Sequence, residues 1–387
     1  MPTPTHLPSD TASVDAPLTL LGGLSPATFM RRHWHKKPLL IRQAVPMAQP
    51  LLTRAALFAL AEQESVESRL VEQRPDGEWR LRHGPLTARQ RPAVRQPGWT
   101  MLVQGVDLHN DGARALLDRF RFLPDARLDD VMVSWASEGG GVGPHVDSYD
   151  VFLLQLQGRR RWQIGRQKDL TLQPDKPLKI LAHFEPEHEW VLEPGDMLYL
   201  PPQWAHDGVS LDADCMTCSV GFRAPQRGGL AAELAVRMGE DHHDAVLYRD
   251  PHQPATTAPA ALPHALVAFA QEGLHSLLSD ESALRLALGE VMTEPKPKVW
   301  FDEPVDEWTP GAVRLDRRTR MLYDERYVFI NGEALRAGGR DAALLRRLAN
   351  ERQLDAASVR RASPAAQAVL SDWHAAGWLH RGSADDQ

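Results

Sequence analysis

The pattern of apolar and polar positions changes character along the chain. Between Asp129 and Arg223, short runs rich in β-branched and aromatic residues, such as DVMVSWA, DVFLLQLQ and EWVLEPGDMLYLPP, follow one another. Turn-forming stretches such as GGGVG and EPGD separate them. Several short strands with regular turns predict an antiparallel sandwich or barrel, and a jelly roll is the expected closed form.

Residues on both sides of this β-rich region have helical spacing. Before it, residues 53–63 and 111–120 are expected to be helical, and Thr53 is suited to cap the first helix. After Pro225, GGLAAELAVRMGEDHHDAV and ALPHALVAFAQEGLHSLLSDESALRLALGEVM carry apolar residues at spacings of three and four. Beyond the linker-like EPKPKVWFDEP, a strand pair around RMLYDERYVFING and two further helical segments resemble a small winged-helix module.

These changes divide the chain into four parts. A chain of 387 residues exceeds what one compact core usually holds, so more than one domain is expected. Residues 1–20, with many Pro, Thr and Ser, predict a disordered tail. We expect the β-rich domain at 21–224, a helical region at 225–300 and the winged-helix-like module at 301–387. The predicted fold class is therefore mainly β, with added α.

Composition narrows the classes of function. Apolar residues make up 43% of the chain and charged residues 25%, as in ordinary globular proteins, and no apolar run is long enough to cross a membrane. Two cysteines and an N-terminus without a secretory signal predict a reducing, cytoplasmic setting. Cys215 and Cys218 would face opposite sides of a strand, which argues against a metal or redox site there. The net charge of −7 argues against a broad nucleic-acid-binding face.

The stretch GPHVDSYDVFLLQLQGRRRW contains a candidate metal site. Residues i and i+2 of a strand share a face, so His145 and Asp147 are expected to aim at the same side. A third ligand must come from another strand, and PGDMLYLPPQWAHDGVSL offers His206 at the start of one. Two histidines and one carboxylate leave metal positions open, as in non-haem Fe(II) oxygenases. A lone His-x-Asp pair is common, but the preceding glycines and a correctly placed third ligand favour iron.

An oxygenase that uses 2-oxoglutarate also needs a cation for the far carboxylate of that cosubstrate. In GRRRWQIG, strand alternation puts Arg160 on the same face as Trp162 and Ile164, which are expected to point inward. A guanidinium group can bind a carboxylate through two hydrogen bonds. Ser134, on DVMVSWA, could add a hydroxyl hydrogen bond to the same carboxylate. The alternative is that the three arginines form a solvated basic turn.

These residues together resemble a known family. HVD with HDG, the approach GGGVGPH, the run SYDVFLLQLQGRRRW and the N-terminal WHKKPLLIR are similar to the bacterial JmjC-type ribosomal oxygenases. That family is cupin-like and depends on 2-oxoglutarate and Fe(II), with O₂ as oxidant. The resemblance implies a JmjC/cupin double-stranded β-helix as the catalytic domain at 21–224. It further implies a helical dimerisation region at 225–300, and a C-terminal winged-helix-like module.

The resemblance also implies a reaction and partners. It implies hydroxylation at Cβ of an arginine side chain in large-subunit ribosomal protein sixteen, by a homodimer. The lack of a long apolar run predicts no membrane partner, and the nearly balanced charges after Arg336 predict no direct DNA binding. His145, Asp147 and His206 become the iron ligands and Arg160 the 2-oxoglutarate partner. Tyr149 and Asp150, directly after the HVD motif, are candidates for contacting a substrate arginine, although they could simply begin a strand.

Two other readings stay open on the sequence. One is a related oxygenase that acts on another residue, such as histidine, or on a small molecule. The other is a non-enzymatic cupin whose winged helix binds DNA. The second is disfavoured because a complete ligand set with an aligned arginine exceeds what sensing requires. Moreover, the arginines of DAALLRRLANERQ are partly offset by Asp341 and Glu351. Demethylation is in doubt, because demethylases of this type use Glu and Lys where this chain has Asp147 and Arg160.

Overall fold

The computed structural model describes residues 13–46, 51–74, 76–240, 244–255 and 258–382. The chain divides into two compact units, Met1–Ala224 and Pro225–Gln387. Each unit has its own hydrophobic clusters. The two units are described in turn.

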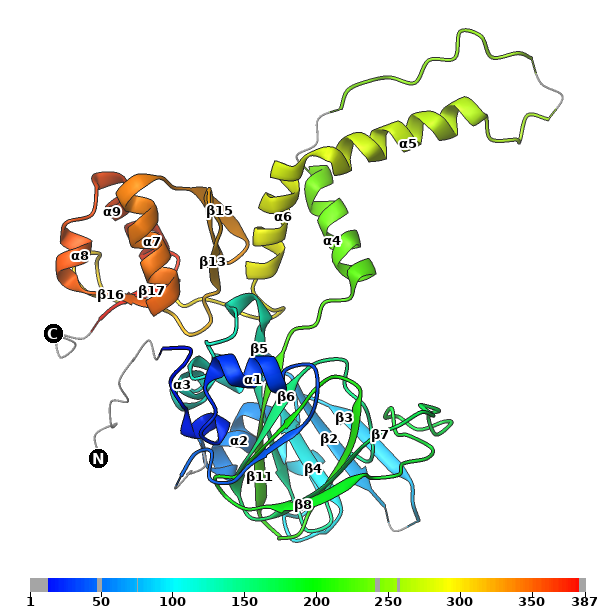
Figure 1. The fold of residues 1–387 in the computed structure, drawn as a ribbon, viewed down its shortest axis with the longest axis vertical. Helices are drawn as coiled ribbons and strands as arrows, with labels where there is room; N and C mark the ends of the chain where they lie inside the picture. Colours follow the sequence, from blue (N-terminus) through cyan, green and yellow to red (C-terminus); the bar gives the residue numbers. More distant parts are fainter. Residues whose placement is uncertain (1–12, 47–50, 75, 241–243, 256–257, 383–387) are drawn as a thin grey trace. The chain divides into compact units, whose positions relative to one another are not determined.

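The N-terminal unit is built on two antiparallel sheets (Figure 1). The larger has eight strands in the order β1-β9-β6-β11-β5-β4-β2-β3, and the smaller has three in the order β10-β7-β8. The large sheet contains β1 (Leu39–Ile41), β2 (Ser68–Gln73), β3 (Trp79–His83), β4 (Trp99–Val103), β5 (Leu128–Ala136), β6 (Val151–Gln157), β9 (Met197–Leu200) and β11 (Cys215–Phe222). The small sheet contains β7 (Arg160–Arg166), β8 (His188–Leu192) and β10 (Trp204–Ser210).

Strand alternation separates two hydrophobic clusters in this unit. On β5, Val131, Val133 and Trp135 face the larger cluster, which the helices cover. A smaller cluster contains Leu153 from the large sheet and Trp162 and Ile164 from the small sheet, so it lies between the sheets. The covering elements are η1 (Thr19–Leu21), α1 (Pro26–Arg32), α2 (Arg54–Ala61), η3 (Val106–Leu108) and α3 (Asp111–Asp118). Two further short helices, η2 (Ala88–Gln90) and η4 (Asp125–Arg127), bury no residue. The side chain of Thr53 caps α2 by accepting from the amide of Ala56.

The N-terminal segment differs from the predicted tail. Residues 1–12 of that tail lie outside the described residues, but the chain from residue 13 is packed. Leu20 and Leu21 are 3% and 0% exposed, and the amide of Ala27 donates to the carbonyl of Val14. Their burial in the larger cluster makes residues 20 and 21 part of the packed N-terminal unit.

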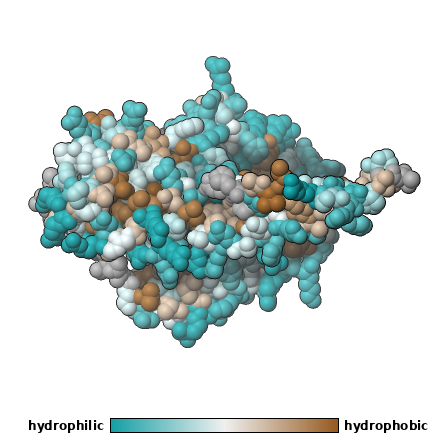
Figure 2. Space-filling view, turned by 90° about the horizontal axis from the view of Figure 1, so that it is seen from above, coloured by the Kyte–Doolittle hydropathy of each residue, from teal (hydrophilic) through white to brown (hydrophobic). Residues whose placement is uncertain are grey.

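The C-terminal unit begins with three helices, α4 (Arg227–Glu240), α5 (His264–Ser279) and α6 (Glu281–Thr293) (Figure 1). The apolar spacing suggested one continuous helical stretch over α5 and α6, but Asp280 breaks it. Its side chain accepts from the amides of Ser282 and Ala283 and so caps α6. In α5, all of which is described, no side chain is buried, and Leu274 and Leu278 are 60% and 59% exposed. On the face drawn in Figure 2, apolar side chains form small separate patches among hydrophilic ones. Within the described residues, no helix is long and apolar enough to span a membrane.

The rest of this unit is a helix-and-hairpin module. Its strands form two small sheets, and its core includes Leu345, Leu348, Trp373 and Leu379. One sheet has β12 (Val313–Leu315), β16 (Gln353–Leu354) and β17 (Leu379–Arg381), and the other has β13 (Met321–Tyr323), β14 (Tyr327–Ile330) and β15 (Glu333–Arg336). The helices are α7 (Gly339–Glu351), α8 (Ala356–Arg360) and α9 (Pro364–Ala375), one more than the sequence suggested. Helix α6 packs closely on β14. A Cβ atom on Gly289 of α6 would lie 2.3 Å from the ring of Phe329 of β14, so glycine permits this approach.

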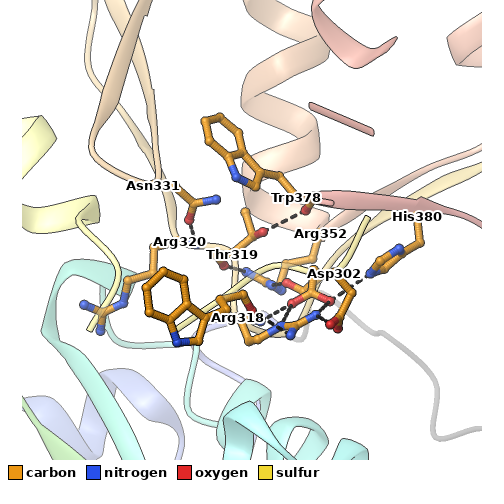
Figure 3. A network of polar contacts seen from close by, with 10 residues as sticks. Asp302, Arg318, Thr319, Arg320, Asn331, Arg352, Trp378 and His380 are labelled. Atoms are coloured by element: carbon orange, nitrogen blue, oxygen red, sulfur yellow. Dashed lines mark hydrogen bonds and ion pairs between the residues drawn. The ribbon is translucent and has the colours of Figure 1, made fainter. Parts of the chain in front are cut away.

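A network of polar contacts, in which Arg318, Arg352 and His380 take part, connects several segments of this module (Figure 3). At its centre is the buried Asp316. The carboxylate of Asp316 accepts from Arg318 Nε at 2.7 Å and lies 2.8 Å from Nε2 of His380. Arg318 also binds Asp302, and Arg352 donates to the main-chain carbonyl of Asp316. Burial opposes ionisation, but the hydrogen bonds from His380 and Arg318 outweigh it and lower the pKa of Asp316 well below its usual range.

Candidate active site

Three potential metal ligands from distant parts of the sequence meet in the N-terminal unit. One ligand atom each from His145, Asp147 and His206 lies within 4.8 Å of the others. His206 Nε2 is 3.6 Å from Asp147 Oδ2, and the two imidazole centroids are 4.2 Å apart. His145 and His206 exchange both main-chain hydrogen bonds, at 3.1 and 2.9 Å. The HVD segment was expected in a strand; it is instead an extended segment that joins β10 through this single bridge.

Main-chain carbonyls orient both imidazole rings. His145 Nδ1 lies 2.9 Å from the carbonyl of Gly143, and His206 Nδ1 lies 3.0 Å from the carbonyl of Trp204. A carbonyl only accepts, so each Nδ1 carries the proton and each Nε2 keeps its lone pair. Gly143 has a φ of 78°, a left-handed conformation that favours glycine. Burial, and then the neighbouring His145, lowers the pKa of His206 to about 4, so its ring is neutral at pH 7.

Arg160 lies on the inward face of β7. It is 5% exposed, and Trp162 and Ile164 share its face, at 5% and 0%. Its Nε and Nη2 atoms are buried and have no hydrogen-bond partner among the described residues. Its neighbour Arg159, in contrast, is exposed and pairs with Asp212 at 3.0 Å. A buried guanidinium without a carboxylate is costly, so this arrangement suits an anionic ligand.

Ser134 is buried on β5, opposite Thr217 of β11. Its hydroxyl donates to the main-chain carbonyl of Thr217 over a long distance of 3.4 Å. The hydroxyl of Thr217 in turn donates to Gln155 at 3.0 Å. Ser134 is therefore held within the large sheet, and its contact to an incoming carboxylate would require this weak bond to break.

Tyr149 and Asp150 have different surroundings. Tyr149 is 38% exposed, and loss of hydration, with the carboxylates of Asp147 and Asp130, raises the pKa of its phenol. Asp150 is 0% exposed and accepts from the hydroxyl of Tyr199 at 2.6 Å. Its other carboxylate oxygen lies 3.0 Å from His35 Nε2 and 3.5 Å from Arg127 Nη2. The predicted contact of Asp150 with a substrate does not fit this burial, because internal partners surround its carboxylate.

The sequence reasoning missed Asp130. It is 3% exposed and accepts from the amide of Gly105 at 3.1 Å. Strand alternation puts residues 130, 132 and 134 on the face of β5 opposite to Val131 and Val133, which face the helices. The alternation in DDVMVSWA could have revealed it, because Asp130 and Ser134 lie four residues apart and so share one face of the strand.

Family models match both parts of the chain. A JmjC domain model matches residues 115–230, and a ROXA-like winged-helix model matches residues 276–380. The winged-helix match begins within the predicted helical region and includes α6.

Relatives and solved structures agree with these matches. Ribosomal protein uL16 3-hydroxylase of Escherichia coli (strain K12) is 33% identical over 81% of this chain and 86% of its own length. A probable ribosomal oxygenase of Haemophilus influenzae is 37% identical over 54% of this chain and 52% of its own. A crystal structure of E. coli YcfD superposes with a TM-score of 0.79 at 30% identity, covering 91% of this chain and 96% of that one. A structure of the same ribosomal oxygenase in complex with cobalt and 2-oxoglutarate gives a TM-score of 0.77 at 30% identity, covering 92% and 98%.

Two facing sheets, a His-Asp-His cluster and the JmjC match define an oxygenase of the JmjC class. Within that class, the chain belongs to the ribosomal oxygenase family. The family and the fold class predicted from the sequence are thereby confirmed, as is the prediction that the chain is an enzyme.

Proposed function

We propose that this chain is a 2-oxoglutarate- and Fe(II)-dependent oxygenase that hydroxylates Cβ of an arginine in ribosomal protein uL16. The observation that carries the chemistry is the His-Asp-His cluster together with a buried arginine whose Nε and Nη2 have no acceptor in the described part of the chain. The substrate assignment is supported by the name of the E. coli relative.

The side chains present fit a divalent iron ion. His145 and His206 offer the lone pairs of their Nε2 atoms, and Asp147 offers a carboxylate oxygen, which is the donor set of non-haem Fe(II) oxygenases. Three protein ligands leave coordination positions for the cosubstrate and O₂. The related structure with cobalt and 2-oxoglutarate supports this assignment.

Arg160 fits the far carboxylate of 2-oxoglutarate. Its two buried N–H groups without an acceptor would gain charge-assisted hydrogen bonds from a carboxylate. Ser134 has a smaller place in the proposal, since its hydroxyl must turn from the carbonyl of Thr217 in order to donate.

Fe(II) and 2-oxoglutarate supply the activation of O₂ when they are bound. The protein orients the two histidine ligands by their bonds to the main-chain carbonyls of Gly143 and Trp204. The apolar cluster between the sheets limits the access of water. Tyr149 gives a partly exposed aromatic surface near Asp147, and the buried carboxylate of Asp130 acts on the same phenol. We assign the partly exposed ring of Tyr149 to the recognition of the substrate guanidinium. Asp130, which is buried and bonded to the amide of Gly105, is a neighbour of that phenol and not a substrate contact in this proposal.

The helical region supports a homodimer. The exposed apolar residues of α5 and α6, among them Leu274, Leu278, Leu284 and Leu288, offer a surface for a second copy. In this proposal residues 225–300 mediate dimerisation, and residues 301–387 form a structural winged-helix module that does not bind DNA directly. The enzyme acts in the cytoplasm, where ribosomal proteins are made. Light scattering after size-exclusion chromatography should give twice the mass of one chain, and a monomer at micromolar concentration contradicts the dimer.

The test is intact-mass spectrometry of uL16 after incubation with the enzyme, Fe(II), 2-oxoglutarate and O₂. We expect one added oxygen that fragmentation maps to an arginine, and no addition with a His145→Ala enzyme. Oxygen mapped to a histidine would show that the enzyme hydroxylates a histidine of uL16 and not an arginine. Succinate without hydroxylated uL16 would keep the oxygenase but overturn the substrate. Neither product, from folded enzyme with iron bound, would favour a binding protein.

A further inference from the structure

The strand register of the small sheet places a glycine opposite the largest side chain of the site. β10 pairs with β7 so that Gly208 lies opposite Trp162, His206 opposite Ile164, and Ser210 opposite Arg160. Since side chains alternate along a strand, His206 and Gly208 share the inward face with Arg160 and Trp162. A potential metal ligand and the carboxylate-binding candidate thus flank this Gly–Trp pair.

The indole of Trp162 fills the space beside Gly208. A Cβ atom on Gly208 would lie 2.5 Å from Cζ3 and 2.6 Å from Cη2 of the ring, closer than carbon atoms approach. Gly208 is within a regular strand and does not have a left-handed backbone. Glycine is therefore required at this position by the proximity of the ring, and any larger side chain would displace Trp162.

Trp162 contacts both functional parts of the site. The Cζ atom of Arg160 is 5.7 Å from the ring centroid, within the range of a cation–π interaction. The ring of His206 is 5.9 Å away. The indole Nε1 is buried and has no hydrogen-bond partner among the described residues, so packing and the contact with Arg160 hold the ring orientation. A displaced ring would therefore disturb Arg160 and His206 together.

We propose that Trp162 is a positioning residue of the active site and that Gly208 is the residue that admits it. The ring fixes the guanidinium of Arg160 relative to the imidazole of His206. The cosubstrate carboxylate and the metal are thereby held at one separation. This inference rests on the proposed use of a metal and 2-oxoglutarate.

The test measures binding instead of turnover. Mn(II) affinity is measured by electron paramagnetic resonance, and 2-oxoglutarate affinity for the Mn(II)-loaded protein by calorimetry. The variants are Gly208→Ala, Trp162→Leu and the combination of both. Trp190→Phe is the matched control, because Trp190 is the register partner of Trp162 on β8 and packs on the same apolar cluster. Thermal unfolding checks that each variant folds, and Trp162→Phe replaces Trp162→Leu if that variant does not.

We expect Gly208→Ala to weaken both affinities by about tenfold, because the added methyl group displaces the ring. Trp162→Leu should weaken 2-oxoglutarate binding by about tenfold and leave Mn(II) binding close to wild type, because the bond to Trp204 still holds His206. The double variant should regain Mn(II) affinity but not 2-oxoglutarate affinity, and Trp190→Phe should change neither.

Wild-type affinities in Gly208→Ala, or wild-type 2-oxoglutarate affinity in the Trp162 variant, would overturn the inference. A double variant that does not regain Mn(II) affinity would do the same. If the wild-type protein binds neither Mn(II) nor 2-oxoglutarate, the proposed function fails instead.

Discussion

Two buried aspartates, one in each unit of the chain, differ in their preferred protonation. Asp150 in the N-terminal unit is 0% exposed and Asp316 in the C-terminal unit is 5% exposed, and each lies beside a histidine and an arginine. Burial raises the pKa of Asp150, and the hydrogen bond from Tyr199 offsets this only in part. The pKa of Asp316 is lowered, because hydrogen bonds from His380 and Arg318 outweigh burial.

The difference lies in the donors that reach each carboxylate. Arg318 binds Asp316 through Nε, Nη2 and its main-chain amide, and His380 adds a further contact at 2.8 Å. Asp150 receives one neutral hydroxyl, a histidine at 3.0 Å, and an arginine only at 3.5 Å. Burial alone therefore does not decide the charge of a carboxylate; the number and directness of its N–H donors do.

Arg160 extends the comparison to a buried group that has unused hydrogen-bond donors. Asp316 has its partners within its own unit, whereas two guanidinium nitrogens of Arg160 have none among the described residues. We interpret the paired charge as structural and the unpaired one as a binding group.

The largest expected effect is on the paired aspartate. Asp316→Ala leaves the guanidinium of Arg318 without its main acceptor and should lower the free energy of unfolding by about 3 kcal/mol. Urea unfolding of the full chain, followed by tryptophan fluorescence, measures it. The control is Asp372→Ala, an exposed aspartate on α9 that should unfold like the wild type. If both variants unfold at the same urea concentration, Asp316 does not have the structural role that we assign to it.

Arg160→Met should separate binding from stability. Loss of a charge-assisted hydrogen bond, worth about 1.5–3 kcal/mol, should weaken 2-oxoglutarate binding by about ten- to a hundredfold. Stability should change by less than about 1 kcal/mol, since Nε and Nη2 give up no hydrogen bond to a described residue and the main loss is the contact with the Trp162 ring. Calorimetry and urea unfolding measure the two quantities. Arg159→Met, at the exposed neighbouring position, is the control and should bind 2-oxoglutarate normally. Unchanged 2-oxoglutarate affinity in Arg160→Met would move the carboxylate site elsewhere.

Asp150→Asn should have a smaller effect on stability than Asp316→Asn. An amide oxygen still accepts the hydroxyl of Tyr199, so the expected cost is about 1 kcal/mol. The KM for uL16 should stay unchanged, because internal partners surround this carboxylate. A KM raised about tenfold with normal stability would restore Asp150 as a substrate contact.

The smallest effects are those of pH, and they have opposite signs. The lowered pKa of Asp316 contributes stability that is present above the unfolded pKa and is lost as the pH falls. Between pH 7 and pH 3.5 the loss is about 0.6 kcal/mol. The pKa of Asp150 is raised, so the folded protein takes up a proton at this aspartate before the unfolded chain does. The protein therefore gains stability as the pH falls from 7 toward the pKa that Asp150 has in the unfolded chain. Unfolding of wild type and each Asp→Asn variant at both pH values isolates the two contributions. If both aspartates changed the free energy of unfolding in the same direction as the pH falls, the comparison between them would be contradicted.

The features that the sequence predicted depend on local spacing. The HVD motif, the order of the third histidine and the two-residue alternation in RRRW need only the geometry of a strand, and the structure brings these residues to one region. The winged-helix-like module followed from its hairpin and helical spacing, and the family match confirms it.

The features that the sequence missed depend on distant pairing. The partners of Asp150 include His35, from a segment far away in the chain, so no local pattern reveals its burial. The contact between Gly208 and Trp162 depends on the register of two strands that are not adjacent in sequence. The break between α5 and α6 did have a local signal, the capping residue Asp280, but the apolar spacing continues across it.

The main-chain bonds that hold His145 and His206 also bear on how this site can vary. Both Nδ1 protons are bound by peptide carbonyls, which every residue type possesses. No side-chain substitution at Trp204 removes such an acceptor, and at Gly143 a substitution acts through the backbone conformation. The tautomer of His206 thus does not depend on the side chain at position 204, and that of His145 depends only on the backbone conformation at position 143. Side chains around the two rings can therefore be exchanged while both Nδ1 protons keep their main-chain acceptors.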